Sequence, residues 1–244
     1  MAEWSDPRAT AARFPAQAGA RDAAFDAGLR SYMLSVYNYM ASGVLLTGVV
    51  AMLFAQSSAA PAILFGPGIL KYLIMFSPLA FVMVLSFGIN RLSTGAAQAL
   101  FWAFAAVMGL SMSSIFFVYT GASIATTFFA TAAAFLGLSL YGYSTKRDLS
   151  AMGTFLVMGV VGLLVASVLN IFLKSPGLTF AISGIGVLLF AGLTAYDTQR
   201  IKSMYAYVAG TDMVGKTVIM GALSLYLDFV NMFTFLLSFL GNRE

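Results

Sequence analysis

Seven apolar stretches divide the chain, and they constrain its fold more than any other feature. They lie at about 32–54, 70–89, 95–118, 121–143, 151–173, 178–196 and 217–240. Each is long enough to cross a hydrocarbon core of about 30 Å as a helix that rises about 1.5 Å per residue. The stretches are nearly continuous and lack the alternation of membrane β-strands. We therefore predict an all-α membrane protein, a bundle of seven transmembrane helices within residues 31–242.

The composition points the same way and excludes several kinds of chemistry. Of the 244 residues, 60% are hydrophobic and 9% are charged, whereas soluble domains carry about 25% charged residues. The chain has no cysteine and no histidine. Disulfides, thiol nucleophiles and histidine-bound zinc or haem are therefore not expected. We expect no cofactor, and any response to pH must come from carboxyl groups.

The distribution of lysine and arginine predicts the orientation in the membrane. With seven spans and a cytoplasmic N-terminus, ten of these residues fall on the inner side and three on the outer side. The inner ones are Arg8, Arg13, Arg21, Arg30, Arg91, Lys146, Arg147, Arg200, Lys202 and Lys216, and the outer ones are Lys71, Lys174 and Arg243. This excess supports a cytoplasmic N-terminus. It also accounts for the isoelectric point near 9.4, so no nucleic-acid partner is expected.

Residues 1–30 precede the first apolar stretch and are rich in alanine, arginine and aspartate. They lack the apolar core of a signal peptide, and acidic residues such as Glu3 and Asp6 disfavour a mitochondrial transit peptide. We predict a disordered cytoplasmic tail over residues 1–30.

Two acidic residues lie at or inside apolar stretches near the C-terminus. Asp197 is predicted at the inner end of the sixth stretch, and Asp228 has about a dozen mostly apolar residues on each side. An ionisable group at membrane depth is costly, so it marks a candidate functional site. Asp228 lies about 12 residues, or about 18 Å of helix, beyond Lys216. The two carboxyls therefore meet only if the last helix starts late, is tilted, or lies centrally with the sixth bent toward it.

The sequence also allows a purely structural role for each aspartate, as an alternative to a functional one. Asp197 could be an ordinary helix-end residue paired with Arg200 or Lys202. Asp228 could be a buried acid that is hydrogen-bonded to Asn231 or to a nearby tyrosine.

Two segments around these aspartates resemble a known family. Ala195-Tyr-Asp-Thr-Gln-Arg-Ile-Lys202 and Ser224-Leu-Tyr-Leu-Asp-Phe-Val-Asn-Met-Phe233 are similar to the C-terminal signatures of the bacterial branch of the Bax inhibitor-1 (transmembrane Bax inhibitor motif) family. The resemblance covers roughly residues 28–242. It implies a seven-helix bundle in which the last helix is central and wrapped by the other six. It also implies a pH-sensitive calcium leak channel in the bacterial inner membrane.

The resemblance assigns roles to three residues. Asp197 and Asp228 match a pair of aspartates that is thought to share a proton and sense pH. Arg91 matches an arginine that is thought to latch to the first aspartate. Some relatives carry a glutamate about eleven residues before this arginine, whereas residues 78–82 read Pro-Leu-Ala-Phe-Val here. A calcium-attracting glutamate is therefore not expected at that place.

Electrostatics agree with a shared proton. Two carboxylates about 4 Å apart repel by about 4 kcal/mol at an effective dielectric near 20, so the pair is expected to hold one proton and to titrate as a unit. Calcium prefers about six or more oxygen ligands. Asp197 and Asp228, helped by Tyr196, Asn231, carbonyls and water, would offer a weak and transient calcium site, which suits a leak path.

The sequence does not match two other classes of membrane protein. An intramembrane aspartyl protease would need Gly-x-Gly-Asp where residues 225–228 read Leu-Tyr-Leu-Asp, and a retinal protein would need a lysine within 217–240. We therefore expect no enzyme. Bacterial relatives are also associated with a membrane-anchored ATP-dependent protease, for which the tail at 1–30 could be a handle. A regulator of that protease is thus the alternative to a channel, with the lipid bilayer, calcium and protons as the other expected partners.

Overall fold

The computed structural model describes residues 13–242, with only the helical backbone given for residues 13–21. Within that part of the chain the protein is helical and contains no strand. Among the described residues, seven helices are long and apolar enough to cross a membrane, which confirms the predicted all-α bundle. The elements are α2 (Arg13–Ala55), α3 (Ala60–Phe65), α4 (Leu70–Gly88), α5 (Thr94–Met112), the 3₁₀ turn η1 (Ser113–Phe117), α6 (Gly121–Ser144), α7 (Ser150–Leu173), α8 (Pro176–Val208) and α9 (Met213–Leu240).

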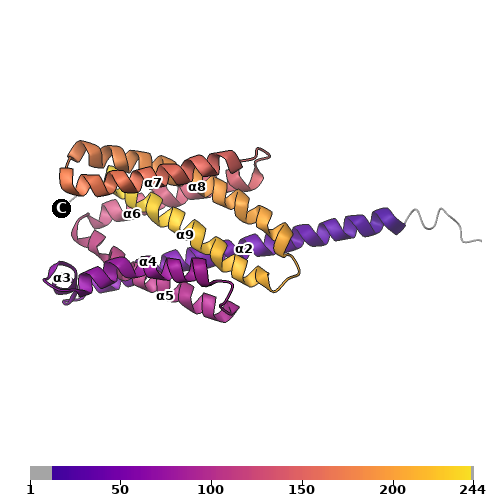
Figure 1. Ribbon diagram of the computed structural model, residues 1–244, viewed down its shortest axis with the longest axis horizontal. Coiled ribbons are helices and arrows are strands. Elements are labelled where there is room, and N and C mark those ends of the chain that lie inside the picture. Colours follow the sequence, from indigo (N-terminus) through magenta and orange to yellow (C-terminus); the bar gives the residue numbers. More distant parts are fainter. Residues whose placement is uncertain (1–12, 243–244) are drawn as a thin grey trace, which may run out of the picture.

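The last helix runs obliquely between two groups of helices (Figure 1). It packs on α8 and α6 in one group and on α2 and α5 in the other, while α7 packs mainly on α8 and α4 mainly on α5. Half of the most apolar window of α9 is buried, the largest share of any span. That α9 is wrapped by all six other helices stays a prediction, because its main contacts are with four of them.

The first helix starts earlier than predicted. A disordered tail was expected over residues 1–30, but α2 begins at Arg13, and residues 1–12 lie outside the described residues. Alanine-rich sequence favours helix, and the side chains that follow find partners on α8. The ring of Tyr205 lies 5.1 Å from that of Phe25 and 5.3 Å from that of Tyr32, centroid to centroid.

The sixth span ends later than predicted, and this difference matters for the site. The sequence predicted its end at residue 196, yet α8 continues to Val208. The polar residues beyond 196 looked like a connection, but the Gln199 and Lys202 side chains bond to neighbouring elements. The apolar Ile201 between them is buried. The connection to α9 is therefore residues 209–212, where Gly210 takes a positive φ of 76°. Such a backbone conformation favours glycine.

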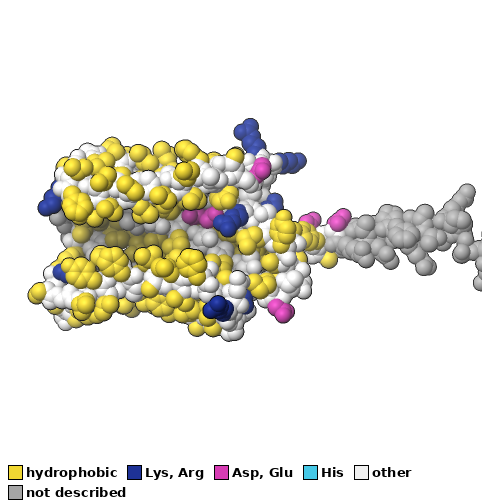
Figure 2. Space-filling model, viewed as in Figure 1, with side chains coloured by type: hydrophobic (Ala, Val, Ile, Leu, Met, Phe, Trp, Pro, Cys, Tyr) yellow, Lys and Arg dark blue, Asp and Glu magenta, His cyan; other side chains and the backbone are white. Residues whose placement is uncertain are grey.

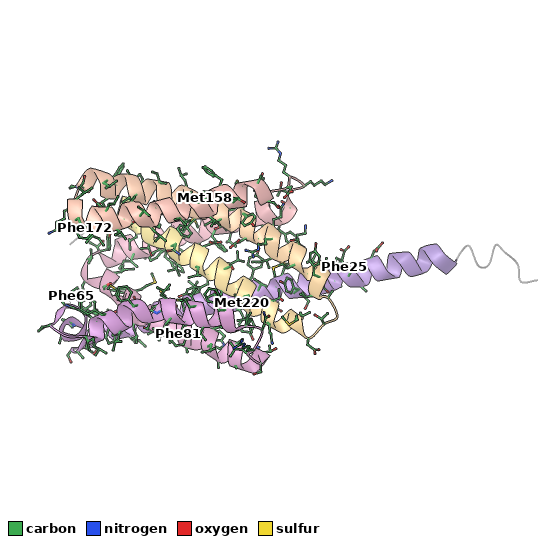
Figure 3. The ribbon with its side chains drawn as sticks, in the orientation of Figure 1. Phe25, Phe65, Phe81, Met158, Phe172 and Met220 are labelled. Atoms are coloured by element: carbon green, nitrogen blue, oxygen red, sulfur yellow. The ribbon has the colours of Figure 1, made fainter. Side chains whose placement is uncertain are left out.

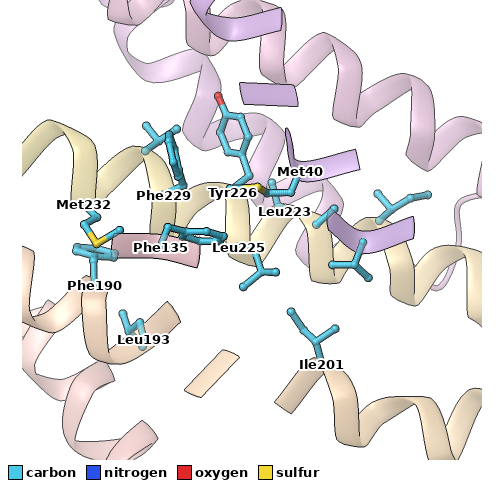
Figure 4. Packing of buried hydrophobic residues seen from close by; sticks show 14 of the residues in the cluster. Met40, Phe135, Phe190, Leu193, Ile201, Leu223, Leu225, Tyr226, Phe229 and Met232 are labelled. Atoms are coloured by element: carbon cyan, nitrogen blue, oxygen red, sulfur yellow. The ribbon is translucent and has the colours of Figure 1, made fainter. Parts of the chain in front are cut away.

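One side of α9 is held by a fully satisfied polar contact. The buried Tyr226 hydroxyl lies 2.6 Å from the Thr47 hydroxyl of α2, which in turn donates to the Ala105 carbonyl of α5 at 2.8 Å. The Tyr226 ring packs edge-on against Phe101 and Phe104 of α5. Figure 4 shows Tyr226 pointing away from the side of α9 that faces Ile201. This contact, the Tyr226 contact, fixes α9 to α2 and α5.

Candidate functional site

Asp228 is a buried carboxyl group with an unsatisfied oxygen. It lies in the middle of α9, 4% exposed. Its Oδ2 atom and the Tyr32 hydroxyl are the two buried side-chain polar atoms without a hydrogen-bond partner in the part of the chain that the structure describes. An unpaired carboxylate in an apolar interior is strongly disfavoured. Neither Asn231 nor a tyrosine bonds to it, so the structural role considered for Asp228 is not seen here.

Asp197 projects from α8 toward the same region. It is half-buried, and its charge acts electrostatically on Asp228. The two carboxyls do not hydrogen-bond to each other in this structure. Figure 2 shows the molecule hollowed between its two groups of helices, with acidic and basic side chains gathered at one place in the hollow. The structure thus places the two aspartates near each other on adjacent helices, without a hydrogen bond between their carboxyl groups.

The extension of α8 explains how the two aspartates reach similar depth. Asp197 lies eleven residues, or about 16 Å of helix, before the end of α8. Asp228 lies fifteen residues, or about 22 Å, after the start of α9. Because the two helices run antiparallel from a short connection and α9 is oblique (Figure 1), both residues lie well inside the bundle.

The cation that acts on Asp197 is Arg200. Arg200 is exposed, lies three residues further along α8, and interacts electrostatically with Asp197. Arg91 is exposed in the connection between α4 and α5 and makes no ion pair with any described residue. The latch between Arg91 and Asp197 is therefore not formed in this structure and stays a prediction. The sequence indicates Arg200 as a partner of Asp197, because residues three positions apart on a helix are neighbours on its surface.

The two auxiliary residues point elsewhere. The ring of Tyr196 packs over Gly153 of α7, so closely that a Cβ at Gly153 would overlap the ring. The side-chain amide of Asn231 donates to the Leu227 carbonyl at 2.8 Å. Neither bonds to an aspartate. No group of three or more acidic, histidine or cysteine side chains that could hold a metal occurs among the described residues, so the calcium ligands stay a prediction.

Two polar residues after Asp197 hold the end of α6 and the α6–α7 connection against α8. The Gln199 side chain donates to the Arg147 carbonyl at 2.8 Å and accepts from the Leu149 backbone N–H at 2.9 Å. The Lys202 ammonium donates to the Tyr143 carbonyl at 2.8 Å and lies 4.6 Å from the centroid of the Tyr143 ring. The sequence carried no direct signal for these contacts, because their partners are backbone groups 50 to 59 positions away.

A chain of hydroxyls beside the site ties three helices together. Tyr37 of α2 lies 2.5 Å from Ser139 of α6, which lies 3.0 Å from Thr198 of α8. Thr198 donates to the Thr194 carbonyl at 2.8 Å, so it must accept from Ser139. The chain therefore ends on a backbone carbonyl and reaches no carboxyl. It stabilises the position of α8 and is not a route for protons to Asp197.

Known proteins match this chain over nearly its whole length. The family model described as inhibitor of apoptosis-promoting Bax1 matches residues 29–244. A Rickettsia prowazekii protein is 51% identical over 221 residues, covering 90% of this chain and 93% of its own length. The inner membrane protein YbhL of Escherichia coli strain K12 is 48% identical over 220 residues, covering 89% and 94%. The chain, a multi-pass membrane protein, therefore belongs to the Bax inhibitor-1 family.

Proposed function

We propose that the protein is a pH-sensitive calcium leak channel, gated by a proton that Asp197 and Asp228 share. The observation that carries the proposal is the buried Oδ2 of Asp228, which has no hydrogen-bond partner and faces the charge of a second carboxyl. A purely structural acid would be bonded to a donor. In a chain without histidine, this pair is the group best suited to bind or release a proton inside the membrane.

The pair works as a switch because its two protonation states favour different distances. With one proton, one carboxyl donates to the other and α8 and α9 are held together. Without it, two like charges about 4 Å apart repel by about 4 kcal/mol at an effective dielectric near 20. That energy is enough to shift a two-state equilibrium by roughly a thousandfold. Separation of the carboxyls would loosen the contact between α8 and α9 and expose oxygen atoms to a passing calcium ion.

Calcium is the transported ion in this proposal and not a resident cofactor. Two carboxyls supply few of the six or more oxygens that calcium prefers. Neighbouring carbonyls and water would complete its shell for the time of passage. With the N-terminus cytoplasmic, as the lysine and arginine count favours, calcium would leak across the bacterial inner membrane.

The test is calcium flux through the purified protein in liposomes between about pH 5 and 8. We expect flux that changes with pH across this range and that persists in Asp148→Asn, a control acid that is exposed and outside the spans. A protein that passes no calcium at any pH would contradict the channel.

A regulator or partner of a membrane-anchored ATP-dependent protease is the alternative proposal. It draws on the long first helix, which extends beyond the other helices (Figure 1) and would offer a handle. Recovery of the protease with the full-length protein, together with an absence of calcium flux, would favour this alternative.

A further inference from the structure

A basic hollow lies at the start of α7, and one of its cations, Arg200, is the residue that interacts with Asp197. It measures about 300 Å³ and is lined by the α6–α7 connection and by α8. Lys146, Arg147 and Arg200 supply three positive charges, and Asp148 supplies one negative charge. The backbone of this connection is not loose, because Gln199 bonds to it at two places.

Two of the three cations in this hollow have no partner. The side chains of Lys146 and Arg147 are exposed and make no hydrogen bond or ion pair with any described residue. Lys202 on α8 differs, since it donates to a backbone carbonyl. Two free cations held beside each other can bind an anion.

The acidic residue of the hollow, Asp148, is hydrogen-bonded at the start of α7 and offsets one of the three positive charges. Hydrogen bonds from the Ser150 side chain and from its backbone N–H keep the pKa of Asp148 below its usual range. Its Oδ1 accepts from the Ser150 N–H at 2.9 Å. A carboxylate near a helix N-terminus is stabilised there. Because three cations face this one carboxylate, the hollow keeps a net positive charge.

The position of the hollow indicates the kind of anion. It lies between the end of α6 at Ser144 and the start of α7 at Ser150, where two spans leave the membrane. Phe155 and Met158, about two turns into α7, are 70% and 71% exposed. Figure 3 labels Met158 and Phe172 along this helix, and Figure 2 shows hydrophobic side chains leading up to the basic end. An anion that also carries acyl chains fits both features.

We propose that this hollow binds the headgroup phosphate of an anionic phospholipid, with the acyl chains lying along the exposed face of α7. Lysine and arginine are the usual partners of phosphate, and basic pockets between transmembrane helices on the cytoplasmic side suit lipid headgroups. This inference does not depend on calcium transport, so it can stand or fall separately from the channel.

The test compares lipid binding to the purified full-length protein by native mass spectrometry, with phosphatidylglycerol and phosphatidylcholine as probes. We expect Lys146→Gln combined with Arg147→Gln to weaken phosphatidylglycerol binding by about 25-fold, about fivefold for each cation. Phosphatidylcholine binding should be weak and unchanged. Lys174→Gln removes an exposed cation at the other end of α7 and should leave binding at the wild-type level.

Two further arms separate charge from folding and lipid from free phosphate. The charge-conserving Lys146→Arg with Arg147→Lys should retain binding, and inorganic phosphate should not compete. The proposal is overturned if the double glutamine variant binds phosphatidylglycerol as the wild type does, or if Lys174→Gln loses as much. Displacement of the lipid by inorganic phosphate would show that the hollow takes a free anion and not a lipid headgroup.

Discussion

Tyr226 and Asp228 lie two positions apart on α9, and both are buried polar side chains inside the membrane. On the Tyr226 side, the hydroxyl has a partner on α2 and the ring packs on α5. On the Asp228 side, Oδ2 has no partner and the charge nearby is another carboxyl. A hydrogen-bonded contact favours one arrangement of its side chains. Two carboxyl groups without such bonds favour a different arrangement for each number of protons that they hold. We infer that α9 is anchored at the Tyr226 contact, whereas the favoured arrangement at Asp228 depends on how many protons the two carboxyl groups hold.

The largest effect on calcium flux should come from substitutions of the two aspartates. Asp197→Asn and Asp228→Asn each remove the repulsion between two like charges, about 4 kcal/mol at an effective dielectric near 20. Each should therefore remove most of the pH dependence of calcium flux, while the similar shape of asparagine preserves the fold. Liposome flux between about pH 5 and 8 measures this. If both variants keep the wild-type pH profile, the sensor lies elsewhere.

A second prediction concerns the packing that supports Asp197. A Cβ at Gly142 of α6 would overlap the carbonyl oxygen of Ala195 on α8, whereas one at Gly137 on the same helix would meet nothing within 4 Å. Gly142→Ala should therefore push α6 from α8 and destabilise the protein by about 1–3 kcal/mol. Gly137→Ala is the matched control and should be neutral or slightly stabilising. Thermal unfolding in detergent compares them, and equal midpoints would contradict the close approach.

A substitution at the Tyr226 contact should change only the stability of the protein. Tyr226→Phe removes the hydroxyl but keeps the ring, and Thr47 still donates to the Ala105 carbonyl. Hydrogen bonds between transmembrane helices average about 0.6 kcal/mol, so we expect a loss of about that size in the free energy of unfolding. The pH profile of calcium flux should stay at the wild-type position. A shifted profile would mean that the two sides of α9 are not independent.

The sequence predicted the spans and the two aspartates, but not the reason that the aspartates lie near each other. Hydropathy alone predicts seven spans, because a membrane-crossing helix must be apolar for about 20 residues. The same rule predicted the end of the sixth span at residue 196, since Gln199, Arg200 and Lys202 are polar. The Gln199 and Lys202 side chains bond to backbone groups at the end of α6 and in the α6–α7 connection, 50 to 59 positions away. Only the folded structure brings these backbone groups into place.

The smallest expected effect concerns the two arginines, Arg200 and Arg91, that could act on Asp197. Arg200 interacts with Asp197 in this structure, whereas Arg91, the residue implied by family resemblance, is exposed and unpaired among the described residues. Arg200→Gln removes a positive charge that favours ionised Asp197, so protonation of the pair should persist to higher pH and the flux transition should move upward. Exposed ion pairs contribute at most about 1 kcal/mol, so the shift should be below about 0.7 pH units.

Arg91→Ala should raise basal flux if Arg91 latches to Asp197 in a closed state that differs from this one. Flux profiles of the two variants, measured side by side with Lys174→Gln as a distant control, decide between them. An unmoved profile in Arg200→Gln together with a shifted one in Arg91→Ala would assign the role to Arg91 and would show that the gating pair closes through an arrangement of α4 and α8 other than the one seen here.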